Sequence, residues 1–111
     1  TKLGSAESRE HVFQTGELVV DDERKEVTVD GETVRMTPVE YKIVKFLMEN
    51  RGLVFSSSQI YENVWNEPSY GADNIVAVHI RHIREKIEVD PSNPRYVTVV
   101  WGKGYKIEAG V

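Results

Sequence analysis

Two histidines stand three residues apart in VAVHIRHIREKIE, residues 76 to 88, among several basic side chains. An imidazole can ligate a metal, fill a core, or face an anion once it is protonated. On a helix, His79 and His82 would lie about 60° apart and could share a ligand, but two imidazoles are too few for a structural zinc site. The only other histidine is His11, in a stretch that predicts strands, and the chain has no cysteine. A metal site is therefore the weakest interpretation, and no cofactor is expected.

The same stretch has the apolar period of a helix with one buried face. At about 100° per residue, its branched apolar residues fall within one narrow arc and are expected in the core. They are Val76, Ile80, Ile83 and Ile87. The opposite face and its flanks hold Asn74, Val78, His79, Arg81, His82, Arg84, Glu85 and Lys86. Such a mixture suits a major groove, where arginine pairs with guanine, asparagine with adenine, and apolar groups contact thymine methyls. An ordinary solvated helix surface has a similar composition, so this helix alone leaves both interpretations open.

The overall charge of −4 argues at first against a nucleic-acid partner, because lysine and arginine supply most of the affinity for phosphates. The charge is unevenly distributed, however. Residues 1 to 70 carry 8 basic and 13 acidic side chains, a balance of −5, whereas residues 71 to 111 carry 6 and 5, a balance of +1. Since the position of the basic groups matters more than their total, the second part of the chain remains compatible with DNA binding.

Short β-prone segments flank the helical part of the chain. Between residues 11 and 36 they are separated by turn residues, and Asp30-Gly31 is a hairpin signal because both positions of such a turn need a positive φ. This stretch predicts a small antiparallel sheet. Later in the chain, YVTVV and YKI enclose Trp101-Gly102-Lys103-Gly104, which predicts a β-hairpin with a glycine-bearing tip.

Three helices are expected between these segments, over about residues 38 to 50, 57 to 65 and 74 to 88. The first two begin at capping boxes, in which a hydroxyl and a longer polar side chain three residues later each accept the other residue's backbone N–H. The start signals are Thr37 with Glu40, Ser56 with Gln59, and Asp73. The apolar stripes of the first two helices indicate core packing. With 111 residues, 40% of them hydrophobic, the chain suits one small domain.

Three separated stretches together resemble one family. MTPVEYKIVKFLMENRGLVFSSSQIYENVW, ADNIVAVHIRHIREKIE and VTVVWGKGYKI are similar, in order and at ordinary spacing, to the winged-helix effector domain of OmpR/PhoB-type response regulators, over about residues 11 to 108. The resemblance implies an α+β fold, a winged helix-turn-helix with an N-terminal antiparallel sheet, three helices and a C-terminal β-hairpin wing. Residues 11 to 111 would form this domain, and residues 1 to 10 would be the remnant of a linker to a receiver domain that is absent from this chain.

The resemblance also implies a function. Domains of this family bind specific sequences of double-stranded DNA in the cytoplasm and control transcription in two-component signalling, as dimers on tandem half-sites that phosphorylation of the receiver domain promotes. The loop at residues 66 to 72 corresponds to one that often touches RNA polymerase. Carried over position by position, the DNA contacts of the third helix fall on Asn74, Ile75, Val78, His79, Arg81, His82 and Arg84.

The wing departs from the family pattern at Trp101, which stands where an arginine usually precedes GxGY. An indole offers a single N–H donor in place of the forked, charged donor set of arginine. Trp101 is therefore expected to pack against the core or the end of the third helix. Lys103, between two glycines, is then the tip residue best placed to reach the DNA backbone or the minor groove.

A winged-helix module that binds protein, without specific DNA binding, is the alternative function, and the negative overall charge favours it. The sequence gives little support to catalysis. Gly102-Lys103-Gly104 precedes a strand, whereas a dinucleotide-binding turn precedes a helix, and Ser56 to Ser58 resemble helix caps rather than a nucleophile elbow. No apolar run approaches the roughly 18 residues of a membrane span, so no membrane partner is expected.

Overall fold

The computed structural model describes residues 11 to 71 and 73 to 110. The elements in chain order are β1 (Val12–Thr15), β2 (Leu18–Asp21), β3 (Glu26–Val29), β4 (Glu32–Val34), α2 (Pro38–Glu49), α3 (Ser57–Trp65), α4 (Asp73–Ile87), β5 (Val97–Val100) and β6 (Gly104–Ile107). This order of a sheet, three helices and a hairpin confirms the predicted α+β winged helix-turn-helix. The expected linker remnant at residues 1 to 10 lies outside the described residues.

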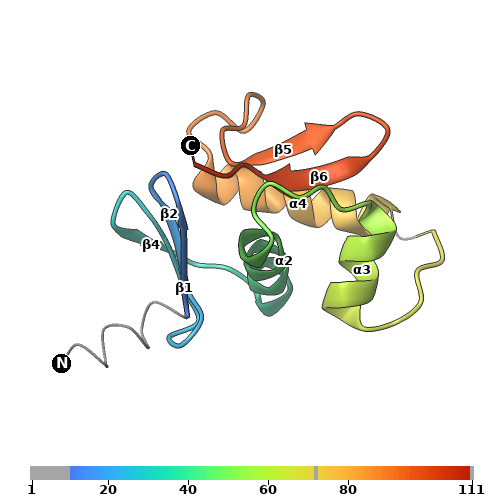
Figure 1. Ribbon diagram of the computed structural model, residues 1–111, viewed down its shortest axis with the longest axis horizontal. Helices are drawn as coiled ribbons and strands as arrows, with labels where there is room; N and C mark the ends of the chain where they lie inside the picture. Colours follow the sequence, from blue (N-terminus) through green and yellow to red (C-terminus); the bar gives the residue numbers. More distant parts are fainter. Residues whose placement is uncertain (1–10, 72, 111) are drawn as a thin grey trace.

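The sheet lies at one end of the molecule, and α3 and the turn of the β5–β6 hairpin lie at the other (Figure 1). Between them α2 packs against α3 and α4 on one side and against β1 and β2 on the other. The inward residues predicted for α4 are confirmed, since each is at most 3% exposed: Val76, Ile80, Ile83 and Ile87. Within the described part of the chain, no helix is long and apolar enough to cross a membrane.

The four N-terminal strands form an antiparallel sheet in the order β1-β2-β3-β4. The predicted hairpin turn joins β3 to β4, with φ of 53° at Asp30 and 81° at Gly31, so both central residues adopt the left-handed conformation that such a turn requires. One face of the sheet contributes Leu18, Val20 and Val27 to the core. The sheet therefore buries its apolar side against α2 and leaves its other side to solvent.

Both predicted capping boxes are present and set the starts of α2 and α3. At α2, Thr37 Oγ1 accepts from the Glu40 backbone N–H at 3.2 Å, and the Glu40 carboxylate accepts from the Thr37 N–H at 3.0 Å. At α3, Ser56 and Gln59 make the same exchange at 3.1 and 2.9 Å. These reciprocal bonds satisfy N–H groups that the helices leave unpaired at their starts. The predicted helix boundaries agree with the observed ones to within one residue.

The wing, formed by the β5–β6 hairpin, is hydrogen-bonded to the segment that precedes α3. Phe55 and Tyr105 exchange backbone hydrogen bonds of 2.9 Å in both directions, which adds a third chain segment beside β6 close to the turn of the β5–β6 hairpin. This close approach requires glycine at position 104, directly before Tyr105, because a Cβ there would lie 2.0 Å from the carbonyl oxygen of Phe55. Gly104 also has a φ of 146°, which L side chains rarely adopt.

Gly104→Ala is therefore expected to lower the free energy of unfolding by about 2 kcal/mol, because the wing must move away from Phe55 to make room for the methyl group. Gly102→Ala is the matched control. Gly102 has a φ of 76° and nothing within 4 Å of the position of its Cβ, so it should lose only about 1 kcal/mol through backbone strain. Urea unfolding of both variants gives the two values. Equal losses would contradict the role assigned to the contact with Phe55.

Candidate nucleic-acid interface

The outward face of α4 presents mixed polar and apolar side chains. Asn74 and Arg81 are exposed, and the apolar side chains Ile75 and Val78 are 45% and 43% exposed. All four lie in the first nine residues of the helix, so they form one surface opposite the buried isoleucines. We call these four residues the α4 face. It combines a forked cationic donor, an amide and two methyl-bearing side chains, which can contact base edges in a major groove.

His79 lies beside the α4 face and is held by two neighbours. Its Nδ1 lies 2.8 Å from the carbonyl oxygen of Ile75, which fixes Nδ1 as the protonated nitrogen because a carbonyl can only accept. The ring also contacts the edge of Trp65, with centroids 5.4 Å apart. Nε2 is thus the nitrogen left for a partner. It accepts a hydrogen bond when the imidazole is neutral and donates one, for example to a phosphate, when the imidazole is protonated.

His82 forms part of an ionic group that joins α4 to the start of α2. The Glu40 side chain is only 4% exposed, and its carboxylate lies 2.5 Å from Lys86 Nζ and 3.9 Å from His82 Nδ1. Burial raises the pKa of Glu40, but the hydrogen bonds from Lys86 and from the Thr37 N–H outweigh it and hold the pKa below its ordinary value. The ionised carboxylate therefore fixes α4 to α2. The sequence showed Glu40 only as a cap, since nothing local relates it to Lys86.

Arg84 differs from its expected position on the flank of the exposed surface. Its Nε donates to the carbonyl oxygen of Val97 at 2.9 Å, and its Nη2 is buried with no partner among the described residues. The guanidinium therefore ties α4 to β5 from the side. Of the two arginines assigned to DNA from the sequence, Arg81 is exposed and Arg84 is half-buried.

The wing tip, residues 101 to 103, is the turn that joins β5 to β6. The prediction that the indole packs against the core or the end of the third helix is wrong, because Trp101 is 91% exposed. It lies in the turn between β5 and β6, where the Lys103 N–H donates to the carbonyl oxygen of Val100 at 2.9 Å and Gly102 has a φ of 76°. This tight turn places residue 101 at the tip of the hairpin, with its side chain in solvent. Lys103 is also exposed, as expected for a tip residue.

The wing tip and the starts of α3 and α4 border one hollow of about 280 Å³. It is lined by Ser56 to Ser58, by Asp73 and by residues 99 to 105. The tip therefore lies beside the first turn of α4 rather than at the far end of that helix. The α4 face and the wing tip are close enough to act on one extended ligand.

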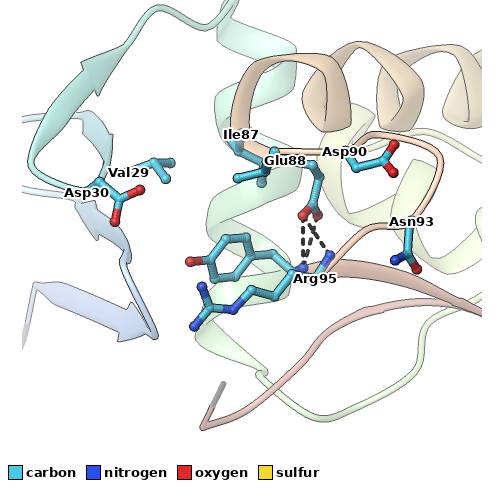
Figure 2. A pocket seen from close by; sticks show the side chains of 9 residues that line it. Val29, Asp30, Ile87, Glu88, Asp90, Asn93 and Arg95 are labelled. Carbon is cyan, nitrogen blue, oxygen red and sulfur yellow. Dashed lines mark hydrogen bonds between the residues drawn. The ribbon is translucent and has the colours of Figure 1, made fainter.

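A second hollow, of about 250 Å³, lies at the opposite end of α4 (Figure 2). Glu88 points into it, and its carboxylate accepts hydrogen bonds from the backbone N–H groups of Arg95, Tyr96 and Val97 at 2.7 to 3.2 Å. These bonds hold the chain as it turns from α4 into β5. The carboxylate is thus engaged in structure, and the hollow is separate from the α4 face.

The described part of the loop after α3 is largely exposed. Asn66 ends α3 in the left-handed conformation with a φ of 59°, and Tyr70 is 89% exposed. Residue 72, the last of the loop that the sequence assigned to RNA polymerase, lies outside the described residues. Across the described residues, no group of three or more histidine, aspartate or glutamate side chains is placed to hold a metal ion.

The chain matches the family described as transcriptional regulatory protein, C terminal, over residues 31 to 107. The chain belongs to this family. Its fold is that of the OmpR/PhoB-type winged-helix effector domains, as the resemblance implied. The family is one of transcription regulators.

Three similar proteins illustrate the relationship. The regulatory protein VanR of Enterococcus faecium is 37% identical over 106 residues, which are 95% of this chain and 46% of VanR. The response regulator DrrB of Thermotoga maritima, an OmpR/PhoB homologue, has a TM-score of 0.81 at 30% identity and is matched over 96% of this chain and 49% of DrrB. The RstA DNA-binding domain of Klebsiella pneumoniae, solved in complex with the RstA box, has a TM-score of 0.80 at 23% identity, over 87% of this chain and 96% of that domain.

The chain spans about half the length of the curated relatives it matches, with 45%, 42% and 46% of three of them covered. The similarity to RstA, at 23% identity, shows the fold alone.

Proposed function

We propose that this domain binds specific sequences of double-stranded DNA and controls transcription as the effector part of a two-component response regulator. The observation that carries the proposal is the α4 face, which presents Arg81, Asn74 and two apolar side chains beside the exposed wing tip. Membership of the family and the RstA domain's complex with its DNA box support it. The domain acts by binding rather than by catalysis.

Each side chain of the interface has a role that follows from its chemistry and position. Arg81 donates two hydrogen bonds to a guanine edge, Asn74 pairs with adenine, and Ile75 and Val78 contact thymine methyls. His79, His82 and Lys103 contact the phosphate backbone or a base edge from the flanks and the wing. Arg84 supports these contacts by holding α4 to β5 through its bond to Val97. Phosphate contacts fix the position of the domain, whereas base contacts select the sequence.

The whole regulator would act in the cytoplasm through further partners. A receiver domain joined through the linker at residues 1 to 10 would place two effector domains, each formed by residues 11 to 111, on tandem half-sites about one helical turn apart. The exposed loop at residues 66 to 72 would contact RNA polymerase. These proposals rest on the family and on the exposure of the loop.

A protein-interaction module without specific DNA binding remains the second candidate, because the chain carries a net charge of −4. Selection of bound duplexes from a random DNA pool distinguishes between these two candidate functions. Specific DNA binding should enrich one short sequence and should weaken steeply as salt rises, since each neutralised phosphate releases counterions. A protein-interaction module would enrich no sequence.

Uracil substitution tests the apolar part of the α4 face. Replacing a contacted thymine by uracil removes only its methyl group, so each replacement should cost about 0.8 kcal/mol, or roughly fourfold in affinity. A protein with Ile75→Ala and Val78→Ala should no longer distinguish the two duplexes. Titration of both proteins with both duplexes gives the comparison. Equal affinity of the unaltered domain for thymine and uracil duplexes would contradict the proposal that Ile75 and Val78 contact thymine methyl groups.

A further inference from the structure

Two adjoining hollows border α2 on its exposed side, and Lys42 and Lys45 line both of them. The first, of about 440 Å³, is lined by apolar or aromatic side chains and by lysines: Met36, Pro38, Tyr41, Lys25, Lys42 and Lys45. The second, of about 280 Å³, extends the first toward Val64 of α3. We call the two hollows together the α2 groove. The first hollow falls in the size range of ligand sites, about 300 to 1,000 Å³.

The α2 groove faces away from α4. Glu40 points toward α4, where its carboxylate contacts Lys86. Lys42 follows two residues later and lies about 200° further round the helix, so its side chain projects from the opposite side. The α2 groove and the α4 face are therefore separate surfaces, and both can be occupied at the same time.

Asp22 ties together the side chains around the first hollow. Its carboxylate accepts from the Tyr41 hydroxyl at 2.6 Å and from Lys25 Nζ at 2.9 Å, and it lies 3.8 Å from Lys45 Nζ. The hydrogen bond from Tyr41, together with the two lysines, holds the pKa of Asp22 below its ordinary value. The neighbouring carboxylate, Asp21, instead accepts from backbone N–H groups of the turn between β2 and β3. One ionised carboxylate therefore orients two cations and an aromatic ring around the hollow.

Lys42 is the cation of the groove that has no counter-ion among the described residues. Lys25 and Lys45 pair with Asp22, and Lys45 also pairs with Glu49 at 3.3 Å, whereas Lys42 is exposed and makes no ion pair in that part of the chain. The three lysines exceed these two carboxylates by one charge, although the whole chain has a net charge of −4. The groove therefore favours an acidic partner over a basic one.

We propose that the α2 groove binds an acidic segment of a partner protein, with an apolar side chain of the segment in the first hollow and a carboxylate on Lys42. Met36, Pro38 and the Tyr41 ring offer this side chain a contact that removes carbon surface from water. DNA fits the groove poorly, because its phosphates would lie against Glu49 and its backbone has no apolar side chain to fill the hollow. Since the groove is separate from the α4 face, the segment would hold the partner on the domain while the domain is bound to DNA.

Selection from a random pool of short displayed peptides identifies the chemistry that the groove recognises. The wild-type domain should enrich peptides in which aspartate or glutamate flanks a leucine, isoleucine or aromatic residue. Binding of an enriched peptide should be about tenfold weaker in Lys42→Glu, because one exposed ion pair is replaced by a repulsion of similar size. Enrichment of basic peptides, or of no peptide, would overturn the proposal.

Lys103→Glu is the matched control, because it makes the same change of charge at the wing tip. It should bind the enriched peptide as the wild type does and bind the selected duplex more weakly, whereas Lys42→Glu should do the reverse. Both positions are exposed, so both variants should melt at the wild-type temperature. Equal losses of peptide affinity would show that total charge governs binding, and equal losses of duplex affinity would show that the groove contacts DNA. Either result would contradict the proposal.

The two methionines of the chain report where the peptide binds. Met36 lines the first hollow, whereas Met48 is 0% exposed in the core. With isotope-labelled methionine methyl groups, the enriched peptide should shift the NMR signal of Met36 and leave that of Met48 unchanged. A peptide whose apolar residue is replaced by alanine should bind at least about tenfold more weakly. An unshifted Met36 signal in the peptide-bound domain would place the peptide elsewhere and rule out the groove.

The same NMR signal separates a partner segment from a second copy of the domain. Without peptide, the Met36 signal should stay in place as the concentration of the domain rises. A shift with concentration alone would show that a second copy fills the groove, and the proposal would be wrong.

Discussion

Arg81→Glu is expected to lower the affinity for the selected duplex by at least about 100-fold and to leave the fold intact. The substitution removes the forked donor set of the α4 face and places a carboxylate against the negative potential of the groove. Arg81 is exposed, so its replacement disturbs no buried contact. Titration of a labelled duplex, with thermal melting of the same sample, measures both effects.

Arg24→Glu is the matched control for this prediction. It changes the net charge by the same amount, but Arg24 lies beside Glu26 in the turn between β2 and β3 of the N-terminal sheet rather than on α4, and its side chain is 70% exposed. Its effect on affinity should be small and confined to low salt, because distant exposed charges are screened. Similar losses in both variants would show that total charge, rather than the α4 face, governs binding.

Lys86→Met is expected to lower the free energy of unfolding by about 3 kcal/mol at neutral pH, because it leaves the buried Glu40 carboxylate without its cation. The Glu40 side chain is only 4% exposed, and Lys86 lies closest to it, with His82 at 3.9 Å. Adding Glu40→Gln should recover much of the loss, since the amide can still accept from the Thr37 N–H and complete the capping box. Urea unfolding of the two single variants and the double variant measures the coupling. Additive losses would contradict a direct ion pair.

The same pair predicts how stability changes in acid. The pKa of Glu40 in the folded protein is below its ordinary value of 4.5, so the unfolded state takes up this proton first as pH falls. The contribution of Glu40 is therefore fully present above that ordinary value and is lost as pH falls through the folded pKa. Unfolding measured across this range should show a smaller acid loss in Glu40→Gln than in the wild type.

Local patterns predicted most of the fold. The capping boxes at Thr37 and Ser56 and the Asp30-Gly31 turn act over a few residues, so the sequence specified the helix starts and the hairpin directly. The buried arc of α4 followed from a period of 3.6 residues. The same period also assigned Asn74 and Arg81 to the exposed side, where the structure places them.

Two of the features that were missed depend on contacts between distant segments. Arg84 bonds to Val97 on another element, and Lys86 pairs with Glu40, which is 46 residues away in the chain. A helical period gives the direction of a side chain but not the element that meets it. Trp101 was misplaced because apolar character was given more weight than its place in a tight turn. The glycines at 102 and 104 were the available signal that residue 101 belongs to the tip.

Affinity for a selected duplex, measured against salt and compared with a scrambled duplex of equal length, tests the central claim most directly. If the α4 face recognises a DNA sequence, the selected duplex should bind at least about 1,000-fold more tightly than the scrambled one. The affinity for both should fall linearly on a log–log plot as salt rises. Equal affinity for the two duplexes, or affinity that does not respond to salt, would contradict specific DNA binding by this domain.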